Sequence, residues 1–346
     1  MQSIKALSLT SDVNAWLANS RHPRILHVFD HACNLTNERG EVLSIVTQEI
    51  GNGPFNLVVE DDVLFSEHLN TETKVFIRAN EITLDGLTIN IANTDIWNPR
   101  PDWERLHGKR DEILNQIMSL RASGSKRSNP HHREEIASSP RSRYGLRNER
   151  SALLDQRLLA TTFPQLPLTN YQQHGLDTPF ATNAQGYPST SSGHRSTTTS
   201  LQSLISNLAP ALANADIATA KTIASQLAGL GSGLTPAGDD FIMGAIYAAW
   251  IIHPHEVAKA LAKEITNTAA PLTTSLSAAW LGSAGRGEAG SLWHELFDAL
   301  VVGDKIEIQK TMDNILAVGE TSGADAMAGF IRTVMCWAEE INREER

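Results

Sequence analysis

The hydrophobic pattern of this 346-residue chain changes its period at about residue 100. Before that point, short runs rich in β-branched and aromatic residues alternate with turn-like spacers, which is typical of strands. The residues up to 100 therefore predict a small β-barrel or sandwich. The expected strands span 24–29, 42–48, 55–59, 74–78, and 81–84 with 87–91 around Asp85-Gly86, a dipeptide typical of a tight hairpin.

Helical spacing replaces this alternation beyond Pro101. Apolar residues then recur at intervals of three and four, which predicts a helix through Trp103, Leu106, Ile113, Ile117 and Leu120. From residue 201 onward one amphipathic helix follows another, with Asp216 as a cap and Pro254 in a first turn. We therefore expect an α+β protein with a β-rich domain over 1–100 and an all-α helical domain over 201–346.

The region between these two domains has a different composition. Residues 121–150 contain eight Lys and Arg, three Glu and almost no large apolar side chains, and residues 183–200 are rich in Ser and Thr. Such segments bury too little apolar surface to offset the entropy lost on ordering. We expect residues 101–200 to form a helix followed by a loop-rich, partly disordered linker.

Charge and hydropathy exclude several classes of partner. The net charge is -10 and the pI is about 5.6, whereas nucleic-acid binding normally uses a basic face. No apolar run is long enough to span a membrane, and the N-terminus lacks the pattern of a secretory signal. We expect a cytoplasmic protein without nucleic-acid or membrane partners, in which Cys33 and Cys336 are buried free thiols.

The stretch GLGSGLTPAGDD, residues 229–240, is the most unusual local feature. Gly229 and Gly231 are able to take left-handed backbone angles at the end of one helix, and a new helix should begin near Pro236 or Ala237. A glycine-rich loop that leads into a helix N-terminus offers backbone N–H groups and the positive end of the helix dipole. This pattern predicts a site for a small phosphate or carboxylate.

Two adjacent carboxylates, Asp239 and Asp240, stand beside this expected anion site, although they would repel an anion. One explanation is that they cap the first turn of the helix. The alternatives are that the ligand also carries N–H donors, or that a cation lies between them.

A second stretch, GETSGADAMAGF over residues 319–330, repeats part of this pattern. Gly323, Asp325 and Gly329 align with Gly238, Asp240 and Gly244. In both stretches the Asp and the later Gly are four residues apart, hence on one helix face, and the alternative is a chance match. If the repeat is real, two helix N-termini should converge on one pocket.

A third stretch, over residues 271–290, combines hydroxyl groups with a cation. Its hydroxyl residues mark a helix N-terminus, where they either cap the helix or reach a ligand oxygen. Arg286 lies between glycines and is able to grip a carboxylate or phosphate with two donors, or is an ordinary surface residue.

In order along the chain, the motifs at 229–241, 273–277 with Gly287-Glu288, and 319–329 resemble the AllH-type subunit of oxamate carbamoyltransferase, a family long treated as a domain of unknown function. The resemblance is specific over 225–335 and holds in outline for the N-terminal β region. It implies one subunit of an assembly with companion carbamoyltransferase subunits, which acts in anaerobic allantoin and purine degradation. The implied reaction converts oxamate and carbamoyl phosphate to oxalurate and phosphate, reversibly and without a cofactor.

This reaction suggests a role for each motif. Asp240 and Asp325 would accept from, or deprotonate, the attacking amide nitrogen, and Thr274 would help to stabilise charge on the carbamoyl oxygen. No residue is expected to bind a metal. The expected substrate-binding residues are Gly231, Ser232, Gly233, Thr235, Gly238, Asp239, Thr273, Ser275, Ser277, Arg286, Glu288, Thr321, Ser322 and Gly323.

Two other functions remain open at this point. The first is a non-catalytic subunit whose anion site completes a partner's active site. The second is a phosphoryl-transfer enzyme that binds Mg²⁺ through Asp239, Asp240 and Asp325.

Overall fold

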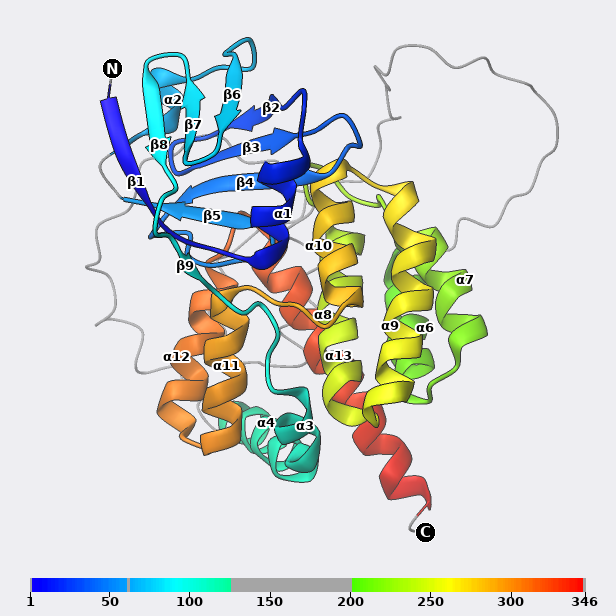
Figure 1. The fold of residues 1–346 in the computed structure, drawn as a ribbon. Coiled ribbons are helices and arrows are strands. Elements are labelled where there is room, and N and C mark those ends of the chain that lie inside the picture. Colours follow the sequence, from blue (N-terminus) through cyan, green and yellow to red (C-terminus); the bar gives the residue numbers. More distant parts are fainter. Residues whose placement is uncertain (1, 61–62, 126–200, 345–346) are drawn as a thin grey trace, which may run out of the picture.

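A barrel-like sheet stands on one end of a group of helices in the computed structural model of the chain (Figure 1). The structure describes residues 2–60, 63–125 and 201–344. The first hundred residues form the sheet, and those beyond 201 are almost entirely helical, which confirms the expected α+β class. The linker expected after the first helix falls largely on residues 126–200, which lie outside the described residues.

The sheet follows the order β2-β3-β4-β5-β1-β8-β7-β6, and β9 pairs with β1 beside this path. A bridge between Arg24 and Lys74 links the two ends of the path, so the sheet is a nearly closed barrel. The strands are β1 (Gln2–Leu9), β2 (Arg24–Val28), β3 (Ala32–Thr36), β4 (Val42–Thr47), β5 (Asn56–Val59), β6 (Val75–Arg78), β7 (Glu81–Leu84), β8 (Leu87–Asn90) and β9 (Asp95–Ile96).

All six expected strands are confirmed to within two residues, and Gly86 has the left-handed φ of 89° that the hairpin turn requires. Three strands were not expected, of which β9 has only two residues. The first of the other two is β1, which lies between β5 and β8, and its sequence QSIKALSL alternates too weakly in hydropathy to stand out. The second is β3, whose sequence ACNLT places a polar residue in the middle of a buried strand.

The helices form the second part of the molecule. Their central member is α8, most of whose side chains are buried, as expected for a helix that is apolar all round. The helices are α1 (Ser11–Asn19), α2 (Phe65–His68), α3 (Trp103–Gly108), α4 (Arg110–Ser125), α6 (Leu201–Ala213), α7 (Ile217–Leu227), α8 (Ala237–Ile252), α9 (His255–Ala269), the 3-10 helix η1 (Ala270–Leu272), α10 (Ser275–Gly285), α11 (Ser291–Val302), α12 (Lys305–Leu316) and α13 (Ser322–Glu344).

The helix boundaries agree with the sequence signals. The side chain of Asp216 caps α7 by accepting from the N–H of Thr219, and Pro236 and Pro254 immediately precede α8 and α9. The region expected to start a helix at Pro101 forms two helices, because the chain turns at Lys109 between α3 and α4. Both cysteines are free and buried, as expected.

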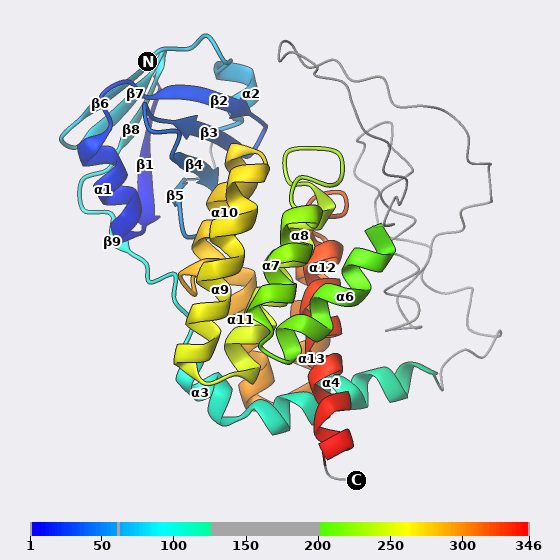
Figure 2. The same ribbon diagram turned by 90° about the vertical axis from the view of Figure 1, so that its right-hand side faces the viewer.

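Helices α8 and α13 pack along each other in the same direction, with both N-termini at the end nearest the sheet (Figure 2). Their backbones approach closely at two glycines. A Cβ atom at Gly244 would lie 1.7 Å from the carbonyl oxygen of Ala326, and one at Gly329 would lie 2.1 Å from the carbonyl oxygen of Phe241. The contact is reciprocal, because Phe241 and Ala326 also occupy matching positions of the two stretches. The sequence repeat is therefore a paired helix-contact motif.

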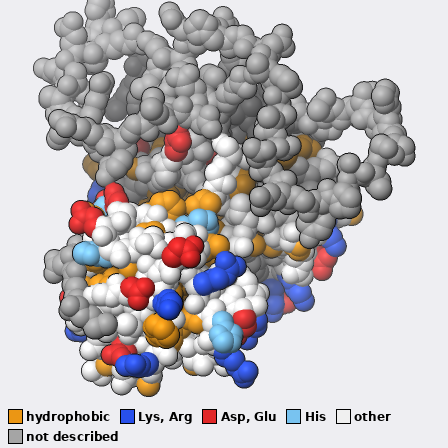
Figure 3. Space-filling model, turned by 90° about the horizontal axis from the view of Figure 1, so that it is seen from above, with side chains coloured by type: hydrophobic (Ala, Val, Ile, Leu, Met, Phe, Trp, Pro, Cys, Tyr) orange, Lys and Arg blue, Asp and Glu red, His pale blue; other side chains and the backbone are white. Residues whose placement is uncertain are grey.

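The distribution of charged side chains on the surface indicates little about function. Lys and Arg side chains are interspersed with Asp and Glu on the face seen from above in Figure 3, which is typical of a solvated surface. Among the described helices, none combines the length and the apolar character needed to cross a membrane.

We predict that Gly244→Ala destabilises the protein by about 3 kcal/mol or more, since the added methyl group would force α8 away from α13. The matched control is Gly108→Ala, because a Cβ atom there meets nothing within 4 Å. Chemical denaturation of both variants measures the difference. Equal free energies of unfolding for the two variants would contradict the role of this contact.

Candidate functional site

A cavity of about 1050 Å³ lies between the outer face of the sheet and the N-termini of α8 and α13. We call it the central cavity. Its sheet side includes residues of β2, β3, β4 and β5, and its helix side includes Thr235, Asp240, Ser322 and Gly323. Residues that are far apart in the sequence therefore line the same cavity.

The two helix N-termini meet directly at this cavity. The hydroxyl oxygens of Thr235 and Ser322 are 2.8 Å apart and form a hydrogen bond. Thr235 ends the glycine-rich loop before α8, and Ser322 is the first residue of α13. The convergence that the sequence repeat predicts is thus present.

The glycine-rich loop folds tightly over the N-terminus of α8. Gly229, Gly231 and Gly233 have φ angles of 73°, 129° and 97°, which only glycine adopts readily. The N–H of Gly238 donates to the carbonyl oxygen of Leu230 at 2.9 Å and closes the loop. In the described chain, the backbone N–H groups of residues 231–235 donate no hydrogen bond, so they remain available to an anion.

The first of the paired aspartates, Asp239, has a structural role. It is buried, accepts from the N–H of Gly229 at 3.0 Å and accepts from the hydroxyl of Thr273. Burial raises the pKa of this carboxyl above its ordinary value, although hydrogen bonds from Thr273, Gly229 and Ser277 oppose the shift. Asp239 therefore fastens the end of α7 and the segment before α10 to the first turn of α8.

Thr274 supports the same loop from α10. Its hydroxyl accepts from the N–H of Ser277 at 3.1 Å as the N-cap of α10 and donates to the carbonyl oxygen of Leu234 at 2.6 Å. Both partners belong to the protein itself. This favours a role in positioning the glycine-rich loop.

The remaining two aspartates occupy matching positions. Asp240 is 5% exposed and lines the central cavity, while Asp325 is 3% exposed. The N–H of Asp325 donates to the carbonyl oxygen of Thr321 at 2.9 Å, in the first turn of α13. Each aspartate is four residues before the glycine that contacts the other helix, so both lie on the faces that α8 and α13 turn toward each other.

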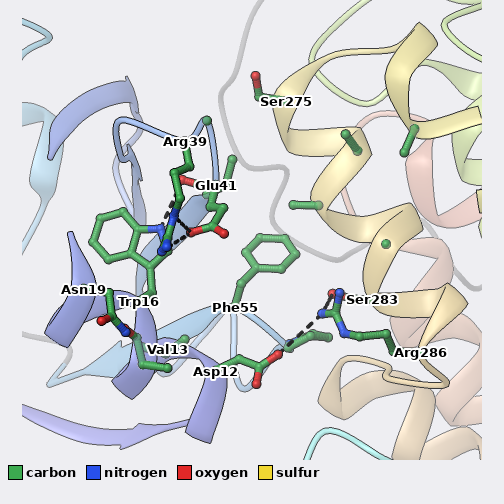
Figure 4. A pocket seen from close by; sticks show the side chains of 18 of the residues that line it. Asp12, Val13, Trp16, Asn19, Arg39, Glu41, Phe55, Ser275, Ser283 and Arg286 are labelled. Carbon is green, nitrogen blue, oxygen red and sulfur yellow. Dashed lines mark hydrogen bonds and ion pairs between the residues drawn. The ribbon is translucent and has the colours of Figure 1, made fainter. Parts of the chain in front are cut away.

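A second cavity, of about 610 Å³, lies between α1 and the loop before β4 on one side and α10 on the other (Figure 4). We call it the lateral cleft. It is lined by Thr273, Ser275 and Arg286. In the described part of the chain, neither cavity's lining includes Gly231, Ser232, Gly233 or Asp325. The residues expected to form one site are therefore divided between two cavities and the supporting structure.

Arg286 is held by neighbouring acids. Its guanidinium donates three hydrogen bonds of 2.7 to 3.1 Å to the buried carboxylate of Glu288 and one of 3.2 Å to the hydroxyl of Ser283. A further ion pair of 3.7 Å connects it to Asp12 of α1 (Figure 4). Arg286 and Glu288 thus bind each other at the boundary between the helices and the sheet.

Sequence reasoning missed the sheet side of the central cavity. Asp30, His31, Asn34, Ser44 and Asn56 all line it. The available signal was a polar residue inside an otherwise apolar strand pattern, as in ACNLT and VLSIVT. In residues 2–60, 63–125 and 201–344, no three His, Cys, Asp or Glu side chains gather closely enough to hold a metal ion.

Comparison with known protein families gives two matches. Residues 5–96 match the model described as the AllH family N-terminal domain. Residues 227–334 match the model described as oxamate carbamoyltransferase subunit AllH. Searches of curated proteins and of solved structures found no match.

We predict that Asp239→Asn unfolds with a higher free energy than the wild type at pH 7. The folded-state pKa of Asp239 is raised, so ionisation of this group at neutral pH opposes folding and proton uptake favours it. The advantage of the variant should therefore shrink as the pH falls toward 3.8, the ordinary aspartate value.

Denaturation at several pH values tests this prediction. The exposed Asp313→Asn serves as the control and should show no such trend. A difference between Asp239→Asn and the wild type that stays constant with pH would argue against a raised pKa.

Proposed function

Since the two matches together cover more than half of its length, this chain belongs to the oxamate carbamoyltransferase subunit AllH family, and we propose that it takes part directly in carbamoyl transfer between carbamoyl phosphate and oxamate. The products are oxalurate and phosphate, and the reaction is reversible. In this proposal, the central cavity is the substrate site and the chain works together with companion subunits.

One observation supports this proposal above all: the hydrogen bond between Thr235 and Ser322 joins two helix N-termini at a cavity that Asp240 also lines. Helix N-termini favour the anionic end of a ligand, and a carboxylate accepts from N–H donors. Oxamate and carbamoyl phosphate each combine an anionic group with an amide-type NH₂ group. The cavity is complementary to both ends of such molecules, which explains an aspartate beside an anion site.

The proposed reaction is a nucleophilic acyl substitution. The amide nitrogen of oxamate attacks the carbonyl carbon of carbamoyl phosphate, a C–N bond forms, and the C–O bond to phosphate breaks with its electron pair leaving on phosphate. The nitrogen loses a proton, which we assign to the carboxylate of Asp240, with Asp325 on the adjacent helix as its partner. An amide nitrogen is a weak nucleophile, so the orientation of the two substrates contributes a large part of the rate.

The glycine-rich loop has the role of holding the phosphate in this scheme. The backbone N–H of Thr235, the loop residue that lines the central cavity, is available for it, and the loop is fixed at its two ends by Asp239 and Thr274. Thr274 then acts on the reaction through the position of the loop. Thr273 supports the first turn of α8 through its hydrogen bond to Asp239, and Arg286 holds Glu288 at the end of α10.

The central cavity lacks the positive charge that its proposed substrate requires. Its charged or titratable lining residues are Asp30, His31 and Asp240, whereas carbamoyl phosphate is an anion. Acidic walls alone would repel this substrate. We therefore assign the cationic groups that neutralise the phosphate to companion subunits, so that the assembled complex is the active form.

We predict that Asp240→Asn lowers kcat of the assembled complex by about 100-fold or more, because the amide is unable to take the proton from nitrogen. The control Asp313→Asn, on the exposed face of α12, should retain wild-type activity. The measurement is phosphate release from carbamoyl phosphate in the presence of oxamate. Wild-type kcat in the Asp240→Asn complex would contradict the catalytic role.

Two further measurements separate the alternative functions. Carbamoyl transfer by this chain without its companion subunits would refute a role in assembly alone. If EDTA abolishes substrate binding to the complex, a Mg²⁺-dependent phosphoryl-transfer site is favoured, whereas retained binding excludes that site.

A further inference from the structure

Three polar side chains form a row across the outer face of the sheet. Asn34 of β3 is opposite Ser44 of β4, and Ser44 is opposite Asn56 of β5, each at a registered Cα pair. All three are at most 5% exposed, and all three line the central cavity. We call them the polar row.

This row is unusual for its position. The neighbouring residues in β3 and β4, such as Leu35 and Leu43, point into the barrel and are fully buried. The row lies on the opposite face, which the helices cover, so apolar side chains are expected there. Asn is also disfavoured in strands. Burying an amide without hydrogen-bond partners costs about 1–3 kcal/mol, so a row of three buried polar groups requires a cause.

Contacts within the protein use only part of the row. The hydroxyl of Ser44 donates to the amide oxygen of Asn34 at 2.6 Å, and the amide nitrogen of Asn56 donates to the carbonyl oxygen of Gly51 at 3.0 Å. Among the described residues, no hydrogen bond uses the amide nitrogen of Asn34 or the amide oxygen of Asn56. One donor and one acceptor therefore remain at the cavity wall.

A ligand with the complementary pair of groups is a primary amide. We propose that the polar row is the amide-recognition wall of the central cavity, in which the amide nitrogen of Asn34 donates to a ligand carbonyl oxygen and the amide oxygen of Asn56 accepts from a ligand NH₂ group. Ser44 fixes the amide of Asn34 in the required orientation. The ligand class is a small carboxamide with an adjacent carboxylate or phosphate.

This inference rests on the proposed function for the identity of the amide, while the row itself is a property of the sheet. It assigns binding residues to the N-terminal region, where no role in substrate binding was expected from the sequence. Both halves of the chain then contact the same substrate.

The test uses Asn34→Asp in the assembled complex, with oxamate as the probe. This change keeps the shape of the side chain and replaces the donor by a carboxylate, so KM for oxamate should rise by about 10-fold or more. Ser44→Ala should raise it less, because it only releases the orientation of Asn34. The matched control is Thr36→Val, two residues along the same face of β3, buried and outside the cavity lining, which should leave KM unchanged.

Binding of oxamate and of oxalate, which lacks the amide, is measured in parallel by calorimetry. The wild-type complex should prefer oxamate, and Asn34→Asp should reduce that preference. An unchanged KM in Asn34→Asp would overturn the inference, and so would an equal loss of activity in Asn34→Asp and Thr36→Val with equally lowered Tm.

The same measurements distinguish this inference from the proposed function. If the wild-type complex binds oxamate in a manner that depends on Asn34 but transfers no carbamoyl group, the polar row is supported and the reaction is wrong. If the wild-type complex transfers the carbamoyl group with no dependence on Asn34, the reaction stands and the row has no part in it.

Discussion

The close contact between α8 and α13 is the constraint on which the rest of the site depends. Gly244 and Gly329 let the two backbones approach to a distance that any side chain would prevent. The helices run in the same direction, so this contact also brings their N-termini together at one end. Without it, Thr235 and Ser322 would have no reason to meet, and the central cavity would lose its helix side. A packing motif in the protein core thus determines the geometry of a polar site at its edge.

Adjacent residues of the glycine-rich stretch have separate functions. Asp239 turns toward Gly229 and Thr273 and fastens the loop, whereas Asp240, the next residue, lines the cavity. Successive side chains on a helix point about 100° apart, so two neighbouring carboxylates are able to serve different surroundings. The hydroxyl groups before α10 complete this division, because Thr273 donates to Asp239 and Thr274 donates to the carbonyl oxygen of Leu234 in the loop. The loop is therefore held both from α8 and from the start of α10.

The sequence was sufficient for the fold class, six strands, the hairpin at Asp85-Gly86 and the N-terminus of α8, because each has a local signal in hydropathy or turn chemistry. It was insufficient for β1, where alanine, serine and lysine weaken the alternation. The polar row could not be predicted from the sequence either, since the meeting of Asn34, Ser44 and Asn56 depends on strand register. Likewise, no local pattern shows that Arg286 binds Glu288 and lines a different cavity from Asp240.

The matching arrangement of the two helix N-termini has a consequence for how a guest molecule is oriented. An anionic group placed there faces two positive helix ends at once, because Thr235 and Ser322 hold the N-termini of α8 and α13 together. On the sheet side, Asn34 and Asn56 keep one donor and one acceptor, which differ in chemistry. In the proposed site, the sheet therefore sets which way round a guest with an amide group lies.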